Sequence, residues 1–208
     1  MDIQTQYIFP TPIWRTNITL ELEKHNITIE DLVNQCLEMK TKDQGRTVSN
    51  IGKTSYQGNN FFLNDIEKTP FEKTWQILHD IVNSIYNDTW CGELNITNAW
   101  ININEKEALN GIHNHPDSIL AGCLYLQVPK NSGKFHIKRH FTEEFIYHRY
   151  GRLKTDSDNN PIYQDHVASE ISYSPVVGDV IIFPAHTMHY VGVNRSNIAR
   201  FSVAFNCG

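Results

Sequence analysis

Residues 111–118 read Gly-Ile-His-Asn-His-Pro-Asp-Ser, and this stretch decides how the chain is interpreted. Side chains two residues apart on a β-strand point to the same face, so His113 and His115 can converge on one point. His115 and Asp117 can do the same if the strand continues through Pro116. Two imidazoles, or an imidazole and a carboxylate, make half of a metal site, and both pairs stay open on spacing alone.

The other half of this candidate site lies near the C-terminus. Residues 178–189 run from a Gly-Asp turn through an apolar strand and Phe-Pro to His189. In the strand that follows, alternation places Arg200 and Ser202 on the face opposite Phe201 and Val203. A buried arginine is costly unless an anion meets it, and its fork of donors suits a carboxylate. Ser202 is placed to add a hydrogen bond.

Outside these motifs, the pattern indicates helices first and strands afterwards, an α+β protein built on a β-sandwich or barrel. We expect an edge strand at residues 7–14, helices near residues 28–37 and 69–85, and short strands from about residue 93 onward. Thr28 with Asp31, and Thr69 with Glu72, resemble capping boxes. We therefore expect one domain over residues 1–208, with residues 1–92 as supporting strand and helices, residues 93–208 as the barrel, and an insertion at 134–168.

Composition excludes several classes of protein. The 208 residues carry 18 basic and 23 acidic side chains, a net charge of −5, which argues against a nucleic-acid partner. No apolar stretch reaches the ~20 residues of a membrane helix, and the first residues lack a signal-peptide pattern. The four cysteines form no C-x-x-C pair, which favours reduced thiols and a cytoplasmic location.

Taken together, these motifs resemble the Fe(II)/2-oxoglutarate-dependent oxygenases, more closely their uncharacterised phage and bacterial branch. The matching segments include residues 9–12, 48–52, 113–116, 121–129, 178–184 and 200–206. The resemblance implies a double-stranded β-helix (a jelly-roll or cupin-like barrel) that holds iron at one mouth. It also implies 2-oxoglutarate and O2 as co-substrates, an oxidised substrate, and release of succinate and CO2, in the cytoplasm of a bacterium or phage-infected host.

The resemblance also assigns roles to residues. It makes His189 the distal iron ligand, and Arg200 with Ser202 the binding site for the distal carboxylate of 2-oxoglutarate. The usual superfamily pattern H-x-D fits His115 and Asp117, whereas alignment on the glycine-led strand favours His113 and His115. A three-histidine site lacks the carboxylate that normally accompanies Fe(II) and 2-oxoglutarate.

Further candidates have a structural and a functional interpretation. Tyr125 can hydrogen-bond the co-substrate or pack in the core, and Asn102 and Asn104 can line the cavity or lie on a solvated face. Arg139 belongs to a basic, aromatic stretch, residues 134–154, that either grips an anionic substrate or only covers the barrel edge. The substrate, a small molecule or a peptide, cannot be read from the sequence, and the apolar N-terminal arm is a candidate homodimer interface. Two other functions compete: a three-histidine cupin-like dioxygenase that uses no 2-oxoglutarate, and a non-enzymatic jelly-roll binding module.

Overall fold

The computed structural model describes residues 11–48, 54–56, 61–87, 92–139, 157 and 170–208. In chain order the elements are β1 (Trp14–Asn17), α1 (Thr19–Lys24), α2 (Ile29–Lys42), β2 (Ser55–Tyr56), α3 (Phe61–Asn64), α4 (Pro70–Asn87), β3 (Ile96–Asn104), β4 (Asn110–His113), β5 (Leu120–Gln127), β6 (Phe135–Lys138), β7 (Glu170–Tyr173), β8 (Asp179–Pro184), β9 (His189–Val191) and β10 (Arg200–Cys207). Within these residues, no helix is long and apolar enough to cross a membrane.

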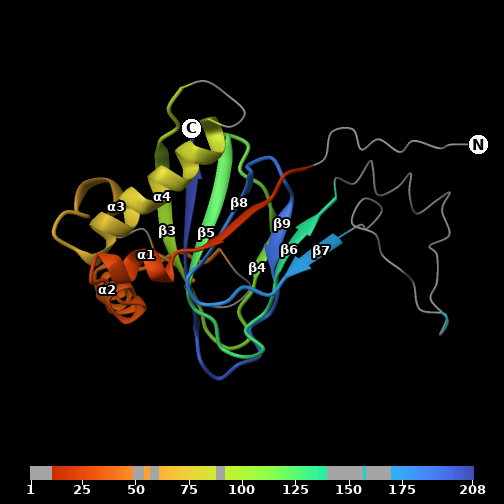
Figure 1. Cartoon of the computed structure of the whole chain (residues 1–208). Helices are drawn as coiled ribbons and strands as arrows, with labels where there is room; N and C mark the ends of the chain where they lie inside the picture. Colours follow the sequence, from red (N-terminus) through yellow and green to blue (C-terminus); the bar gives the residue numbers. More distant parts are fainter. Residues whose placement is uncertain (1–10, 49–53, 57–60, 88–91, 140–156, 158–169) are drawn as a thin grey trace, which may run out of the picture.

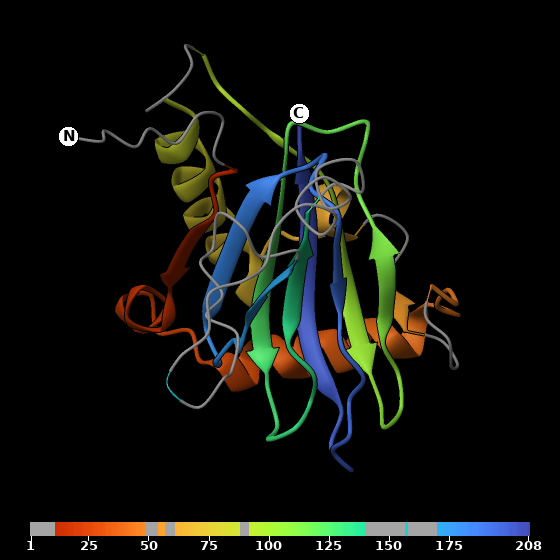
Figure 2. The same cartoon turned by 90° about the vertical axis from the view of Figure 1, so that its right-hand side faces the viewer.

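The strands form two antiparallel sheets. Sheet A has the strand order β1-β8-β5-β10-β3-β2, and sheet B has the order β4-β9-β6-β7. The helices lie on one side of sheet A and sheet B lies on the other, so the molecule has three layers (Figure 1). Figure 2 views the molecule from the side of sheet B and shows α2, in orange, crossing behind the strands.

Alternation along the strands gives sheet A two different faces. Ile101, Ile103 and Phe205 belong to the large apolar core that also contains buried side chains of α2 and α4. The opposite face, toward sheet B, carries Trp100 and Asn102, as the alternation of residues 94–104 predicts. The helices therefore stabilise the outer face of sheet A and leave its inner face for the site.

The predicted helix starts are largely confirmed. Thr28 caps α2 with the expected capping box, in which its side chain accepts from the Asp31 backbone N–H and Asp31 accepts from the Thr28 backbone N–H. Pro70 is the first residue of α4, but Glu72 accepts from the backbone N–H of Lys68 rather than from that of Thr69. The Thr69 hydroxyl donates to the carbonyl of Ile66 and does not cap the helix, so the predicted second capping box does not form.

Three expectations about the elements change. The edge strand is β1, at the edge of sheet A as predicted, but it begins at Trp14, whereas residues 7–10 lie outside the described residues. The insertion cannot begin at residue 134, because β6 pairs with β7 and β9 as an integral strand of sheet B. Two helices that were not predicted, α1 and α3, have only 6 and 4 residues, which is too short for a visible helical periodicity.

Candidate metal centre

Three histidines meet between the two sheets. One potential ligand atom from each of His113, His115 and His189 lies within 4.8 Å of the others. The ring centroids of His113 and His189 are 4.2 Å apart, and that of His115 lies 5.0 and 5.1 Å from them. Three convergent imidazoles without a thiolate suit a divalent transition metal such as iron, copper or zinc.

The backbone brings these three side chains together in two ways. His113 ends β4 and is the direct cross-strand partner of His189, which begins β9. His115 lies beyond the end of β4 and is held by its backbone N–H, which donates to the carbonyl of Ala185 at 2.8 Å. The predicted convergence is therefore observed, although only His113 is on the strand.

Hydrogen bonds fix two of the rings. Nδ1 of His113 lies 2.7 Å from the carbonyl oxygen of Gly111, and Nδ1 of His189 lies 2.9 Å from that of Thr187. A carbonyl only accepts, so each Nδ1 carries a proton, and a neutral ring in this position has its lone pair on Nε2. Metal-binding histidines show this arrangement, in which the second nitrogen is oriented by a backbone acceptor.

Burial keeps two of the rings neutral. Desolvation, followed by the nearby His113, lowers the pKa of His115 to about 4. The same causes lower the pKa of His189 to about 3, although its hydrogen bond to Thr187 acts in the opposite direction. Both imidazoles are therefore unprotonated at neutral pH, which is the state that binds a metal.

Asp117 is not part of this cluster. Pro116 and Asp117 form a turn immediately after the extended segment, and Asp117 is exposed. The alternation needed to bring Asp117 onto the same face as His115 therefore ends before it. Of the two pairs that the spacing leaves open, the structure brings His113 and His115 to His189.

Arg200 is the second notable feature of this region. Its side chain is only 1% exposed, and its guanidinium donates to the carbonyl oxygens of Ser132 and Gly192 and to Oδ1 of Asn110. These acceptors are neutral, and no carboxylate pairs with Arg200 among the described residues. Burial accordingly lowers the pKa of Arg200. A buried cation with neutral partners only is costly, and an anionic ligand would offset that cost.

The shape around Arg200 depends on a glycine. Gly133 has φ +89°, and a Cβ there would lie 2.1 Å from the carbonyl oxygen of Gly192 and 3.0 Å from Nη1 of Arg200. Only glycine fits this position, because the backbone approaches too closely and the dihedral is left-handed.

Unpartnered polar atoms surround the same end of the site. Ser202 is the cross-strand neighbour of both Asn102 and Tyr125, and Arg200 is that of Asn104. Burial raises the pKa of Tyr125 well above its ordinary value, so its hydroxyl stays a donor. Buried atoms that lack a hydrogen-bonding partner among the described residues include Asn102 Oδ1, both amide atoms of Asn104, Tyr125 OH and Ser132 Oγ. Such atoms are rare in folded proteins unless a ligand or water satisfies them.

One cavity of about 520 Å³ connects these features. Its lining includes the three histidines, Tyr125 and Ser202, as well as Asn102. It contains no aspartate or glutamate among the described residues. Arg200 does not line the cavity itself but donates to Asn110, which does. A divalent cation at the histidines would therefore make this region positive and complementary to an anion.

The remaining candidates lie elsewhere. Asn104 is fully buried beside Arg200 and does not line the cavity. Arg139 directly follows β6 and does not line it either. Sequence reasoning missed Asn110 and Asn98; alternation with Trp100 and Asn102 could have indicated Asn98.

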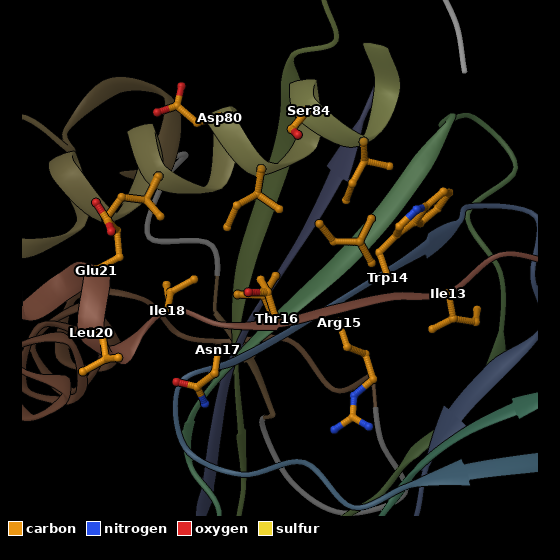
Figure 3. Close-up of a pocket in the computed structure, with 15 residues that line it drawn as sticks. Ile13, Trp14, Arg15, Thr16, Asn17, Ile18, Leu20, Glu21, Asp80 and Ser84 are labelled. Carbon is orange, nitrogen blue, oxygen red and sulfur yellow. The ribbon is translucent and has the colours of Figure 1, made fainter. Parts of the chain in front are cut away.

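A larger cavity, of about 780 Å³, lies on the other face of sheet A between β1 and α4 (Figure 3). In this view Arg15 and Asn17 point away from α4. The walls of this larger cavity are mainly aliphatic and include Ile77, Ile81 and Ile182. The cluster of potential metal ligands in the described residues lies in the smaller cavity, which is therefore the candidate site for chemistry.

Comparison with known protein families decides the class of enzyme. Residues 98–206, slightly more than half of the chain, match a family model described as "Putative 2OG-Fe(II) oxygenase". The chain belongs to this family of 2OG-Fe(II) oxygenases. The matched segment contains all three clustered histidines and Arg200. Membership in an oxygenase family makes the chain an enzyme. No curated protein sequence matches the chain.

Solved structures show the same fold. A prolyl-4-hydroxylase from Pseudomonas putida matches with a TM-score of 0.60 and 11% identity, over 93% of this chain and 91% of the hydroxylase. The epimerase SnoN from nogalamycin biosynthesis matches with a TM-score of 0.61 and 11% identity, over 94% and 75%. HygX from Streptomyces hygroscopicus, solved with iron bound, matches with a TM-score of 0.56 and 12% identity, over 95% and 82%. These similarities confirm the double-stranded β-helix.

Proposed function

We propose that this oxygenase binds Fe(II) through His113, His115 and His189 and binds 2-oxoglutarate with its distal carboxylate at Arg200. The observation that carries the proposal is the charge of the site. Three histidines line a cavity without a carboxylate among the described residues, and the buried Arg200 guanidinium, which does not line it, donates to the lining residue Asn110. A divalent metal would add two positive charges, and a dianion that reaches from the metal toward Arg200 offsets most of this charge.

The residues around Arg200 suit a carboxylate. The guanidinium fork donates to carboxylate oxygens, and the Tyr125 hydroxyl adds a donor from the neighbouring strand. The carbonyl of Ser132 and Oδ1 of Asn110 accept from the guanidinium and hold it in place. A ligand carboxylate would thus satisfy the buried cation and at least one of the atoms that now lack a partner.

When bound, Fe(II), 2-oxoglutarate and O2 together supply the oxidising power, with 2-oxoglutarate released as succinate and CO2 while a substrate is oxidised. The chain itself orients the three ligand rings and keeps two of them unprotonated. It also lines the metal with the rings of Phe183 and Phe135, whose centroids lie 4.5 and 5.8 Å from that of His189. These apolar rings exclude water from the buried side of the histidine cluster.

The cellular setting proposed is the cytoplasm. Cys36, Cys123 and Cys207 are free thiols, and Cys36 and Cys207 are buried. Reduced cysteines are typical of a reducing compartment, which supports this location.

The proposed function is tested by an anaerobic titration of the protein with Fe(II) and then 2-oxoglutarate. We expect the weak visible charge-transfer band of the iron chelate in the wild type and in Asp117→Ala, and its loss in His113→Ala. A band that persists in His113→Ala but disappears in Asp117→Ala would assign the metal to a carboxylate triad. If the wild type binds Fe(II) but gives no band, the function without 2-oxoglutarate replaces the one proposed here.

A further inference from the structure

The cavity has a second polar end, which the proposed chemistry does not use. Asn98 on β3 and Asn206 on β10 are direct cross-strand partners, and both line the cavity. Oδ1 of Asn206 is buried and has no hydrogen-bonding partner among the described residues. This pair of amides forms a polar patch, which we call the amide end of the cavity.

The amide end is too far from Arg200 to belong to the same ligand. Six residues separate Arg200 from Asn206 along β10, which is about 20 Å at the usual rise of a strand. The carbon chain of 2-oxoglutarate has four carbon–carbon bonds of about 1.5 Å each. One molecule therefore cannot occupy both ends, and the amide end is left for a second ligand.

The amide end also lies near the histidine cluster. Trp100 is two residues from Asn98 on the same face, and its ring centroid is 5.7 Å from that of His115. Opposite Trp100 across the sheet are the short side chains of Ala204 and Cys123, which leave space above the sheet. A ligand held at the amide end is therefore close to the metal ligands.

The chemistry of this end is neutral and partly apolar. Each carboxamide offers a donor and an acceptor side by side, the pattern that pairs with another amide-like edge. Trp100 supplies an aromatic face beside the pair. At the cavity mouth, Val48 and Ile112 are 52% and 51% exposed and line the entrance. Outside the histidine cluster, the positive charge in the lining comes from Arg46, which is exposed at the mouth.

We propose that Asn98 and Asn206 bind the oxidisable substrate, and that this substrate carries a neutral amide edge on a flat or apolar group that contacts Trp100. The inference rests on the proposed function, because it places the substrate beside the metal and opposite 2-oxoglutarate. It goes further by assigning the substrate class and two residues that determine specificity.

Two probes of equal size test this assignment: benzamide, which has the amide edge, and benzoate, which has the same ring with a negative charge. Binding is measured by saturation-transfer NMR in the millimolar range that a fragment of this size reaches. It is measured once with the protein alone and once with Zn(II) and 2-oxoglutarate present. We expect benzamide to bind several-fold more tightly than benzoate. We expect Asn98→Leu and Asn206→Leu each to weaken the binding of benzamide by about tenfold, as for the loss of one good bidentate amide contact.

Two controls separate this proposal from the proposed function. Asn197→Leu changes an exposed asparagine that accepts only from Lys106, and it should leave benzamide binding unchanged. Arg200→Met should weaken the binding of 2-oxoglutarate but not that of benzamide. A failure to bind 2-oxoglutarate therefore leaves the benzamide result interpretable. Tighter binding of benzoate while Zn(II) and 2-oxoglutarate occupy the metal and Arg200 would indicate recognition of an anion through Arg46 and overturn the proposal. Absence of benzamide binding, or equal binding by the Asn98, Asn206 and Asn197 variants, would also overturn it.

Discussion

Replacement of Arg200 by methionine separates ligand binding from folding. In the protein without ligand, the guanidinium is buried and donates only to neutral acceptors. Methionine replaces only the aliphatic stem of arginine and is apolar, so it removes the desolvation cost while leaving acceptors unpaired and the space of the guanidinium empty. These two effects oppose each other, and we expect little change in the free energy of unfolding without 2-oxoglutarate.

The effect on 2-oxoglutarate should be large. Two charge-assisted hydrogen bonds to the carboxylate, each contributing about 1.5–3 kcal/mol, sum to at least about 3 kcal/mol. This corresponds to a Kd about 150-fold weaker. At a 2-oxoglutarate concentration of about 100 times the wild-type Kd, the ligand stabilises the wild type by about 2.7 kcal/mol and the variant by about 0.3 kcal/mol. For a chain of this length, the shift in Tm is about 5–11 °C for the wild type and about 1 °C for the variant.

The assay is thermal unfolding of the protein loaded with Mn(II), which replaces iron so that no turnover occurs, with and without 2-oxoglutarate. Arg195→Met is the matched control, because Arg195 lies just before β10 and forms an exposed ion pair with Glu107 at 2.7 Å. The control should keep the full shift. A full shift in Arg200→Met would refute the assignment of the carboxylate to Arg200, and loss of the Mn(II)-induced shift would show that Arg200 acts through the fold.

Two substitutions test the packing and capping of the fold. Gly122→Ala should lower the free energy of unfolding by about 1–3 kcal/mol, because the added Cβ would lie 2.3 Å from Cζ of Phe205; a urea titration with an unchanged midpoint would contradict this. Thr28→Ala should lower the free energy of unfolding by about 1 kcal/mol, because the Thr28 side chain caps the first turn of α2 by accepting from the Asp31 backbone N–H. If Asp31→Ala lowers the free energy of unfolding more than Thr28→Ala does, the hydrogen bond from the Thr28 backbone N–H to the Asp31 side chain contributes more than the bond accepted by Thr28.

Much of the site could be predicted from the sequence, because strand geometry has a period of two. That period placed Arg200 and Ser202 on one face and predicted that His113 and His115 converge. The choice between His113 and Asp117 could not be made from spacing, since it depends on where β4 ends. The turn at Pro116 and Asp117 provides the answer only once the backbone is known.

Other features depend on contacts between distant segments. Asn110 touches Arg200 from a strand 90 residues earlier, and no local pattern connects the two. The pairing of Asn98 with Asn206 requires the register of β3 on β10. Alternation could place Asn206 on the inner face, but it could not identify the residue opposite. The helices were predicted where the apolar stripe is long, as in α4, and missed where it is only a turn or two, as in α1.

The most direct test of the account is a crystal structure of the protein with Mn(II) and 2-oxoglutarate, grown without oxygen. We expect Nε2 of His113, His115 and His189 to coordinate the metal and the distal carboxylate of 2-oxoglutarate to contact Arg200. Coordination by Asp117, or a distal carboxylate bound away from Arg200, would contradict it.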